Sequence, residues 1–281
     1  MHVLDIESLT PVQINEIFRL ADQLRTEPEG SLLAGKTFVL FFPGTSLRTR
    51  ASFEKGIHSL GGQCLLFPPE TLDTREQLGD VIQYVQNWAD GVIVRYPEHS
   101  KLLELSKHSA IPIINAMTAY NHPCEILSDL YALSRAREDY RELVYTFVGP
   151  ASNISRSWMQ MAQVMNLAFH HVCTAGNELA AESPAYRFHT DLDAVLPASD
   201  VILTDSLPAA YKTEAYITNY QINLERMKRT KPGALLNPCP PFFRGEEVSE
   251  EVIASSYFTG YAFKKNLLVV QQAILVYALG H

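Results

Sequence analysis

Hydroxyl and guanidinium side chains follow the first buried apolar stretch, 37–42, of this 281-residue chain. Residues Ser46 to Arg50 read Ser-Leu-Arg-Thr-Arg and open a stretch with helical periodicity. The backbone N–H groups and the dipole of a helix N-terminus favour an anion. Ser46, Arg48 and Thr49 would add donors that suit phosphate oxygens. The segment therefore predicts an anion site, although a capped helix with surface arginines would use the same residue types.

Two further candidates follow later apolar stretches. Arg95 ends the run Gly-Val-Ile-Val-Arg, and His122 precedes Pro123, a residue that suits the first turn of a helix. Each could instead be a solvated or structural residue. Ligands of doubly wound folds bind at the carboxyl ends of the strands, so this shared position favours one common site.

Apolar runs alternate with amphipathic stretches along the chain, which predicts an α/β protein with two doubly wound parallel-sheet domains. The runs are rich in Val, Ile, Leu and Phe, as expected for strands buried on both faces. The expected strands are Thr37–Phe42, Gln63–Phe67, Gly91–Arg95, Ile111–Asn115, Leu143–Val148, His170–Thr174, Asp200–Thr204 and Ala234–Asn237. The expected helices include Thr49–Leu60, Arg75–Trp88, Cys124–Arg137 and Ser155–Met165. A charged stretch at 135–142 predicts the domain boundary.

Composition excludes several classes of protein. A net charge of −8 argues against a nucleic-acid binder, although a local site can still be basic. The sequence has no run of 18 apolar residues and no apolar segment at its N-terminus, so we expect neither a membrane span nor a secretory signal. The four cysteines form no CxxC pair, which suits reduced thiols rather than a zinc cluster. These features predict a cytoplasmic protein.

The candidate residues carry a family resemblance. Segment 46–50, Arg95 and segment 122–125 (His-Pro-Cys-Glu) resemble the Ser-Thr-Arg-Thr-Arg…Arg…His-Pro-x-Gln pattern of the aspartate/ornithine carbamoyltransferases. The second half continues the resemblance in sequence order and follows the ornithine branch. Its matching segments are 149–157, Thr204-Asp205, 239–248 with Cys-Pro-Pro…Arg-Gly-Glu-Glu-Val, and 266–273.

The resemblance implies an architecture and an assembly. It implies a carbamoyl-phosphate-binding domain at 1–137, an amine-substrate domain at 138–263, and a C-terminal helix at 264–281 that packs back on the first domain. It also implies a homotrimer with sites between subunits. The implied partners are two small molecules, carbamoyl phosphate and an amine, and the reaction needs no metal or organic cofactor.

The resemblance also implies roles for individual residues. Ser46, Arg48, Thr49 and the backbone of Leu47 would hold the phosphate group. Arg48, Thr49, Arg95 and His122 would be catalytic, because they would stabilise charge that develops on the carbonyl and bridging oxygens. Glu125 would meet the carbamoyl nitrogen. The other candidates for substrate binding are Arg75, Asn153, Asp205, Cys239 and Pro240.

Departures from the family pattern leave the acceptor open. Glu125 stands where the family has Gln, and an ionised carboxylate near a phosphate dianion is unfavourable, so its pKa is raised, it faces away, or the ligand differs. Segment 207–210, Leu-Pro-Ala-Ala, replaces a Ser-Met-Gly loop, and Leu267 replaces an Arg. Asp205 suits an ammonium group. The candidate acceptors are ornithine, an acylated ornithine and a diamine such as putrescine. Two other functions also stay open: ornithine carbamoyltransferase proper, and a noncatalytic paralogue that binds an anionic metabolite.

Overall fold

The chain folds into two compact units. The computed structural model describes residues 1–26 and 30–280. Unit 1 comprises Met1–Ala132 with Lys265–His281, and unit 2 comprises Leu133–Lys264. Positions 27–29 of the expected first domain, and position 281 of the expected C-terminal helix, lie outside the described residues.

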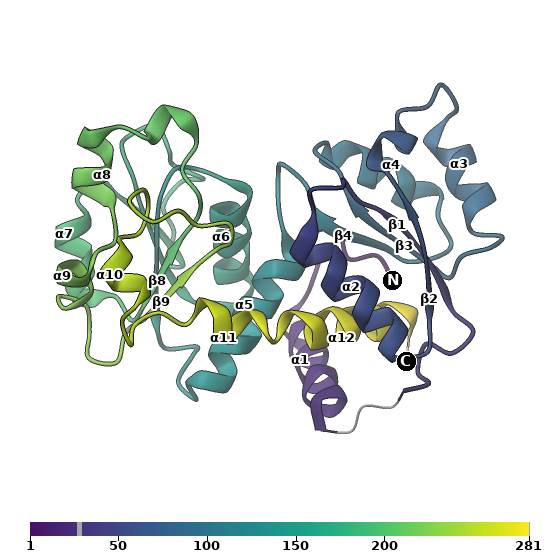
Figure 1. Cartoon of the computed structure of the whole chain (residues 1–281), viewed down its shortest axis with the longest axis horizontal. Coiled ribbons are helices and arrows are strands. Elements are labelled where there is room, and N and C mark those ends of the chain that lie inside the picture. The colour runs from purple at the N-terminus through teal and green to yellow at the C-terminus, as the bar shows by residue number, and fades with distance from the viewer. Residues whose placement is uncertain (27–29, 281) are drawn as a thin grey trace. The chain divides into compact units, whose positions relative to one another are not determined.

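Unit 1 is built on a four-stranded parallel sheet in the order β2-β1-β3-β4 (Figure 1). Its strands are β1 (Thr37–Phe41), β2 (Gln63–Phe67), β3 (Gly91–Arg95) and β4 (Ile113–Met117). Its helices are α1 (Pro11–Thr26), α2 (Leu47–Ser59), η1 (Pro69–Leu72), α3 (Leu78–Val85), α4 (His99–His108), α5 (Pro123–Ala136, which crosses into unit 2) and α12 (Leu267–Leu279). This alternation of strands and helices is the doubly wound arrangement that the sequence predicted.

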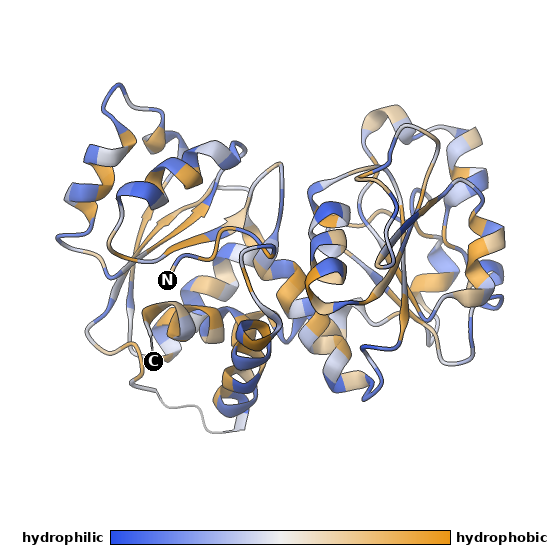
Figure 2. Cartoon of the chain, turned by 180° about the vertical axis from the view of Figure 1, so that it is seen from behind, coloured by the Kyte–Doolittle hydropathy of each residue, from blue (hydrophilic) through white to orange (hydrophobic). Residues whose placement is uncertain are grey.

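Helices cover both faces of this sheet. On one face, Val39 and Val94 pack with Ile82 of α3 and Leu102 of α4. On the other, Phe42 contacts Phe53 of α2, with ring centroids 6.2 Å apart. Figure 2 shows the strands in hydrophobic colours. This burial fixes the start of α2 just beyond the carboxyl end of β1.

The C-terminal helix α12 belongs to unit 1, as the resemblance implied. It packs on α1 and α2 and is apolar almost all round, which is typical of a buried helix (Figure 1). Gln272 Nε2 donates to Gly56 O at 2.9 Å and to Ser59 Oγ at 2.8 Å. The helix thereby anchors the C-terminal end of α2.

Unit 2 contains a five-stranded parallel sheet in the order β7-β6-β5-β8-β9. Its strands are β5 (Val144–Val148), β6 (Ala168–Val172), β7 (Tyr186–His189), β8 (Val201–Thr204) and β9 (Leu235–Pro238). Its helices are α6 (Asn153–Met165), α7 (Leu192–Val195), η2 (Leu196–Ala198), η3 (Ala209–Tyr211), α8 (Glu214–Tyr220), α9 (Leu224–Met227), α10 (Glu250–Ile253) and α11 (Gly260–Lys264). Trp158 of α6 stacks near Tyr145 of β5 at 5.5 Å, and an aliphatic cluster around Ile202 and Leu236 fills the other face.

Some predicted elements were wrong in detail. The expected burial of 63–67 on both faces is wrong, because β2 is an edge strand and most of its side chains are exposed. Strand β4 begins after Pro112, which has no N–H for a ladder, and β6 begins at Ala168, two residues after the left-handed Asn166 that ends α6. Strand β7 was missed because its four residues, Tyr-Arg-Phe-His, form no aliphatic run.

Candidate active site

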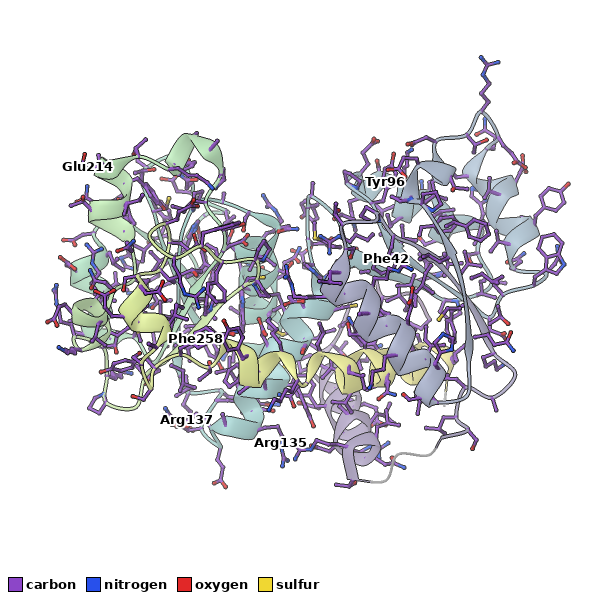
Figure 3. The ribbon with its side chains drawn as sticks, in the orientation of Figure 1. Phe42, Tyr96, Arg135, Arg137, Glu214 and Phe258 are labelled. Atoms are coloured by element: carbon purple, nitrogen blue, oxygen red, sulfur yellow. The ribbon has the colours of Figure 1, made fainter. Side chains whose placement is uncertain are left out.

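Arg95 connects the two hydroxyls that follow β1. Its Nη1 atom donates to Ser46 Oγ at 3.1 Å and to Thr49 Oγ1 at 3.3 Å. Ser46 and Thr49 are both buried. Strands β1 and β3 are neighbours in a parallel sheet, so Ser46 and Arg95 emerge at the same edge. Phe42 and Tyr96, which are labelled in Figure 3, directly follow these strands. The structure therefore brings together Ser46, Thr49 and Arg95, three residues that the sequence predicted for one site.

The first turn of α2 is arranged to receive an anion. Ser46 is the N-cap residue, but its side chain makes no capping hydrogen bond to the helix. Its hydroxyl instead accepts from Arg95. The N–H groups at a helix start lack intrahelical partners and attract negative charge together with the helix dipole. Hydroxyls and a guanidinium beside such a helix start form a phosphate-type site.

The other residues of this turn differ in their surroundings. Arg48 is exposed, and Leu47 has 74% of its surface exposed, so only the Leu47 backbone could serve a ligand. Arg50 pairs with a residue one turn further along the same helix, and its Nε atom lies 2.6 Å from Glu54 Oε1. The two arginines of Arg-Thr-Arg thus have different surroundings, which the sequence alone does not show.

His122 lies at the same edge of the sheet, after β4. The loop that precedes it is held by Thr118 and Asn121, which hydrogen-bond to each other, and Ala119 N donates to Pro97 O in the loop after β3. His122 Nε2 lies 3.9 Å from Glu125 Oε2, and both side chains are buried. The carboxylate that departs from the family pattern is therefore next to the imidazole.

Arg75 completes the candidates of unit 1, and Cys124 lies between His122 and Glu125. The Cys124 thiol is fully buried, and its burial, with the charge of Glu125, raises its pKa, so it is unsuited to act as a nucleophile. Arg75 is exposed on the loop between η1 and α3. Asp73 anchors that loop by accepting hydrogen bonds from Lys101 and Tyr96.

The candidates of unit 2 follow three adjacent strands. Asn153 begins α6 after β5, where Ser152 and Ser155 form a reciprocal capping box. Asp205 follows β8, and its Oδ1 accepts from Ser206 N at 2.9 Å. Cys239 follows β9 and donates its backbone N–H to Thr204 O at 2.9 Å, and Pro240 joins Pro241 through a cis peptide bond. Since β5, β8 and β9 are neighbours, these loops share one edge of the sheet.

Glu247 is a residue to which the sequence argument gave no role. It is only 3% exposed, and Oε1 accepts from Phe243 N at 2.6 Å. Burial raises its pKa to about 7. The signal was present in Arg-Gly-Glu-Glu-Val at 244–248, but a sequence does not show which of two adjacent glutamates is buried.

Among residues 1–26 and 30–280, no group of three His, Cys, Asp or Glu side chains could hold a metal ion. No helix within those residues has the length and apolar character needed to cross a membrane.

Family comparisons agree with this architecture. Residues 1–135 match the carbamoyl-phosphate-binding domain of aspartate/ornithine carbamoyltransferases, and residues 141–278 match the Asp/Orn-binding domain. The chain therefore belongs to the aspartate/ornithine carbamoyltransferase family, and it is a transferase of the carbamoyltransferase class.

Similar proteins cover the chain over its full length. It is 30% identical to an ornithine carbamoyltransferase of Carboxydothermus hydrogenoformans (99% of this chain, 97% of the relative), and 29% identical to one of Chromobacterium violaceum (100% and 97%). Crystal structures of ornithine carbamoyltransferases from Burkholderia thailandensis and Thermus thermophilus superpose with TM-scores of 0.91 and 0.90. Each is 25% identical and covers 99% of this chain and 98% of its own.

Proposed function

We propose that this protein transfers the carbamoyl group of carbamoyl phosphate to the amine of an ornithine-like acceptor and releases phosphate. The observation that carries the proposal is the bridge from Arg95 to Ser46 and Thr49 at the start of α2. This arrangement supplies hydroxyl, guanidinium and backbone donors at one place. A phosphorylated substrate with a polar carbonyl group suits all of them.

The proposed chemistry follows from where charge develops. A neutral amine attacks the carbonyl carbon and forms the new C–N bond, the C–O bond to phosphate breaks, and the amine proton leaves with the phosphate. Negative charge grows on the carbonyl oxygen and on the departing phosphate. Ser46, Thr49 and the Leu47 backbone hold the phosphate, while Arg48, Arg95 and His122 stabilise the developing charge. Glu125 accepts from the carbamoyl NH2. Its nearness to His122 supports this role, because it places the carboxylate beside the proposed catalytic imidazole.

Unit 2 binds the acceptor in this proposal. Asp205 receives a cationic amine, and Asn153, Cys239 and Pro240 contact the remainder of the molecule. The match to the Asp/Orn-binding domain and the names of the relatives favour ornithine or a close analogue. The loop at 207–210 lacks the Ser-Met-Gly of the ornithine branch, so an acylated ornithine or a diamine also fits.

We further propose a cytoplasmic homotrimer. The edge strand β2 ends in three consecutive apolar residues, Leu65, Leu66 and Phe67, each more than a third exposed. Contiguous apolar residues on an unpaired edge are typical of a surface that another chain covers. Arg75, exposed on the following loop, would then reach the site of a neighbouring subunit.

The test is an assay of ureido product and phosphate release with carbamoyl phosphate and a panel of amines. The panel contains ornithine, N-acetylornithine, N-succinylornithine, putrescine, lysine and aspartate. We expect product with at least one of the five amines other than aspartate. We expect none with aspartate, because Asp205 suits an ammonium group and not a second carboxylate. The Arg95→Met variant serves as the matched enzyme control and should lose the product.

The noncatalytic alternative predicts a different result. Glu125 and Leu267 motivate it, because both depart from the family pattern. It predicts that phosphate or carbamoyl phosphate binds, as measured by calorimetry, while no amine yields product. Failure of both binding and turnover would reject the site at α2.

A further inference from the structure

Glu247 closes the loop that carries the acceptor-binding candidates Cys239 and Pro240. Its Oε1 atom accepts from Phe243 N at 2.6 Å, and its backbone carbonyl accepts from Ile222 N at 2.9 Å. The side chain is 97% buried, since only 3% of its surface is exposed. It therefore fixes the chain between β9 and α10 from within.

The second carboxyl oxygen of Glu247 has an unusual environment. Oε2 is buried and has no hydrogen-bond partner among the described residues. A charged carboxylate oxygen without a donor is costly in a protein interior. Burial is the main cause that raises the pKa of Glu247 to about 7, and the negative charges of Glu246 and Asp205 add to it.

The charged groups around Glu247 are already paired or share its sign. Lys212 Nζ lies 2.8 Å from Glu246 Oε2, so this cation is engaged by the neighbouring carboxylate. Arg244 Nε lies 3.1 Å from Glu250 Oε1. Asp205 is close enough for its charge to act on Glu247. A positive charge brought to Asp205 would therefore act on Glu247 as well.

We propose that Glu247 is a positioning residue for the acceptor, one that holds the 239–243 loop and releases a proton when a cationic amine binds beside Asp205. This inference rests on the proposed acceptor role of Asp205. No bond to the amine is made or broken; the carboxyl proton passes to solvent, and the ionised Glu247 balances part of the added positive charge. The acceptor class is thereby narrowed to amines that keep one cationic group in the bound state.

Calorimetry in two buffers of different ionisation enthalpy tests the coupling. The probe is ornithine, or the panel amine that gives product, added to protein saturated with inorganic phosphate at pH 7. A group with a pKa near 7 is about half protonated there, so wild type should release about 0.5 proton per amine more than Glu247→Gln. Glu251→Gln is the matched control, because it removes an exposed carboxylate of the same charge on α10, and it should release as much as wild type.

A second measurement does not depend on any amine. The amide resonance of Phe243 should shift with a midpoint near pH 7 in the ligand-free protein, because Phe243 N donates to the titrating carboxyl. Glu247→Gln should abolish this titration. Glu247→Leu should raise the acceptor KM more than tenfold yet leave phosphate affinity, which is set in unit 1, unchanged.

The outcomes separate this inference from the proposed function. Equal proton release by wild type and Glu247→Gln, or a Phe243 midpoint near pH 4, would overturn the role of Glu247 while leaving amine turnover in place. If no panel amine binds although phosphate does, the acceptor part of the proposed function fails, and the inference fails with it.

Discussion

Replacing Arg95 by methionine should remove much of the affinity for phosphate and carbamoyl phosphate. Arg95 donates to two buried hydroxyls at the start of α2. Methionine retains the apolar stem but loses the charge and all donors. A hydrogen bond to a charged group contributes about 1.5–3 kcal/mol, and 1.4 kcal/mol is a factor of ten. We therefore expect phosphate to bind roughly 10- to 100-fold more weakly.

Isothermal titration with inorganic phosphate and with carbamoyl phosphate measures this loss. Arg50→Met is the matched control, because it removes an arginine one residue beyond Thr49 whose side chain pairs with Glu54 on the surface of α2. Such an i,i+4 pair is worth about 0.3–0.5 kcal/mol, so phosphate affinity should change less than about threefold. Arg95→Lys, which keeps the charge but not the planar fork, should lie between the two.

Two results would refute this reasoning. Equal weakening by Arg95→Met and Arg50→Met would show that only overall positive charge matters and that the bridge has no special role. Unchanged binding in Arg95→Met, with folding confirmed by urea denaturation, would remove Arg95 from the site. Either result would also weaken the case for catalysis at the start of α2.

Three other perturbations have defined outcomes. Glu125→Gln should tighten inorganic phosphate binding by about 1 kcal/mol, because a buried negative charge beside an anion site is removed; weaker binding by calorimetry would contradict this. Gln272→Leu should lower the free energy of unfolding, measured by urea denaturation, by about 1–3 kcal/mol, because it removes two hydrogen bonds to α2. Gln271→Leu should leave that free energy equal or higher, because the buried Gln271 amide has no partner among the described residues. Equal losses in the two variants would show that the hydrogen bonds to α2 are not the cause. Burial lowers the pKa of His171 to about 4, so the unfolded chain takes up a proton at a higher pH than the folded protein does. The free energy of unfolding should therefore fall by about 3 kcal/mol as pH drops from 6.5 to 4. His171→Gln should flatten this dependence of the unfolding free energy on pH, and an unchanged slope would show that other groups dominate.

Much of the fold could be predicted because local patterns and tertiary structure agree. Apolar runs of four to six residues became parallel strands, since both faces of each inner strand are buried. The pattern failed where burial is incomplete or the run is not aliphatic. Strand β2 has the same residue types as the inner strands but lies at an edge, and β7 forms from Tyr-Arg-Phe-His because it pairs with β6.

The sequence by itself determined the family, the alternation of strands and helices, and the residue types of the candidate anion site. Motifs such as Ser-Leu-Arg-Thr-Arg and His-Pro-Cys-Glu act locally, because a helix start needs only neighbouring residues to present its donors. Only the tertiary structure decided that Arg95 reaches Ser46 and Thr49 while Arg50 turns to Glu54. It also decided that Glu247 is buried while Glu246 pairs with Lys212. The Arg50–Glu54 pair lies within one helix, but the bonds of Arg95 and Lys212 join residues distant in sequence, and the burial of Glu247 depends on which side chains lose water. Neither the distant contacts nor the burial can be read from residue types.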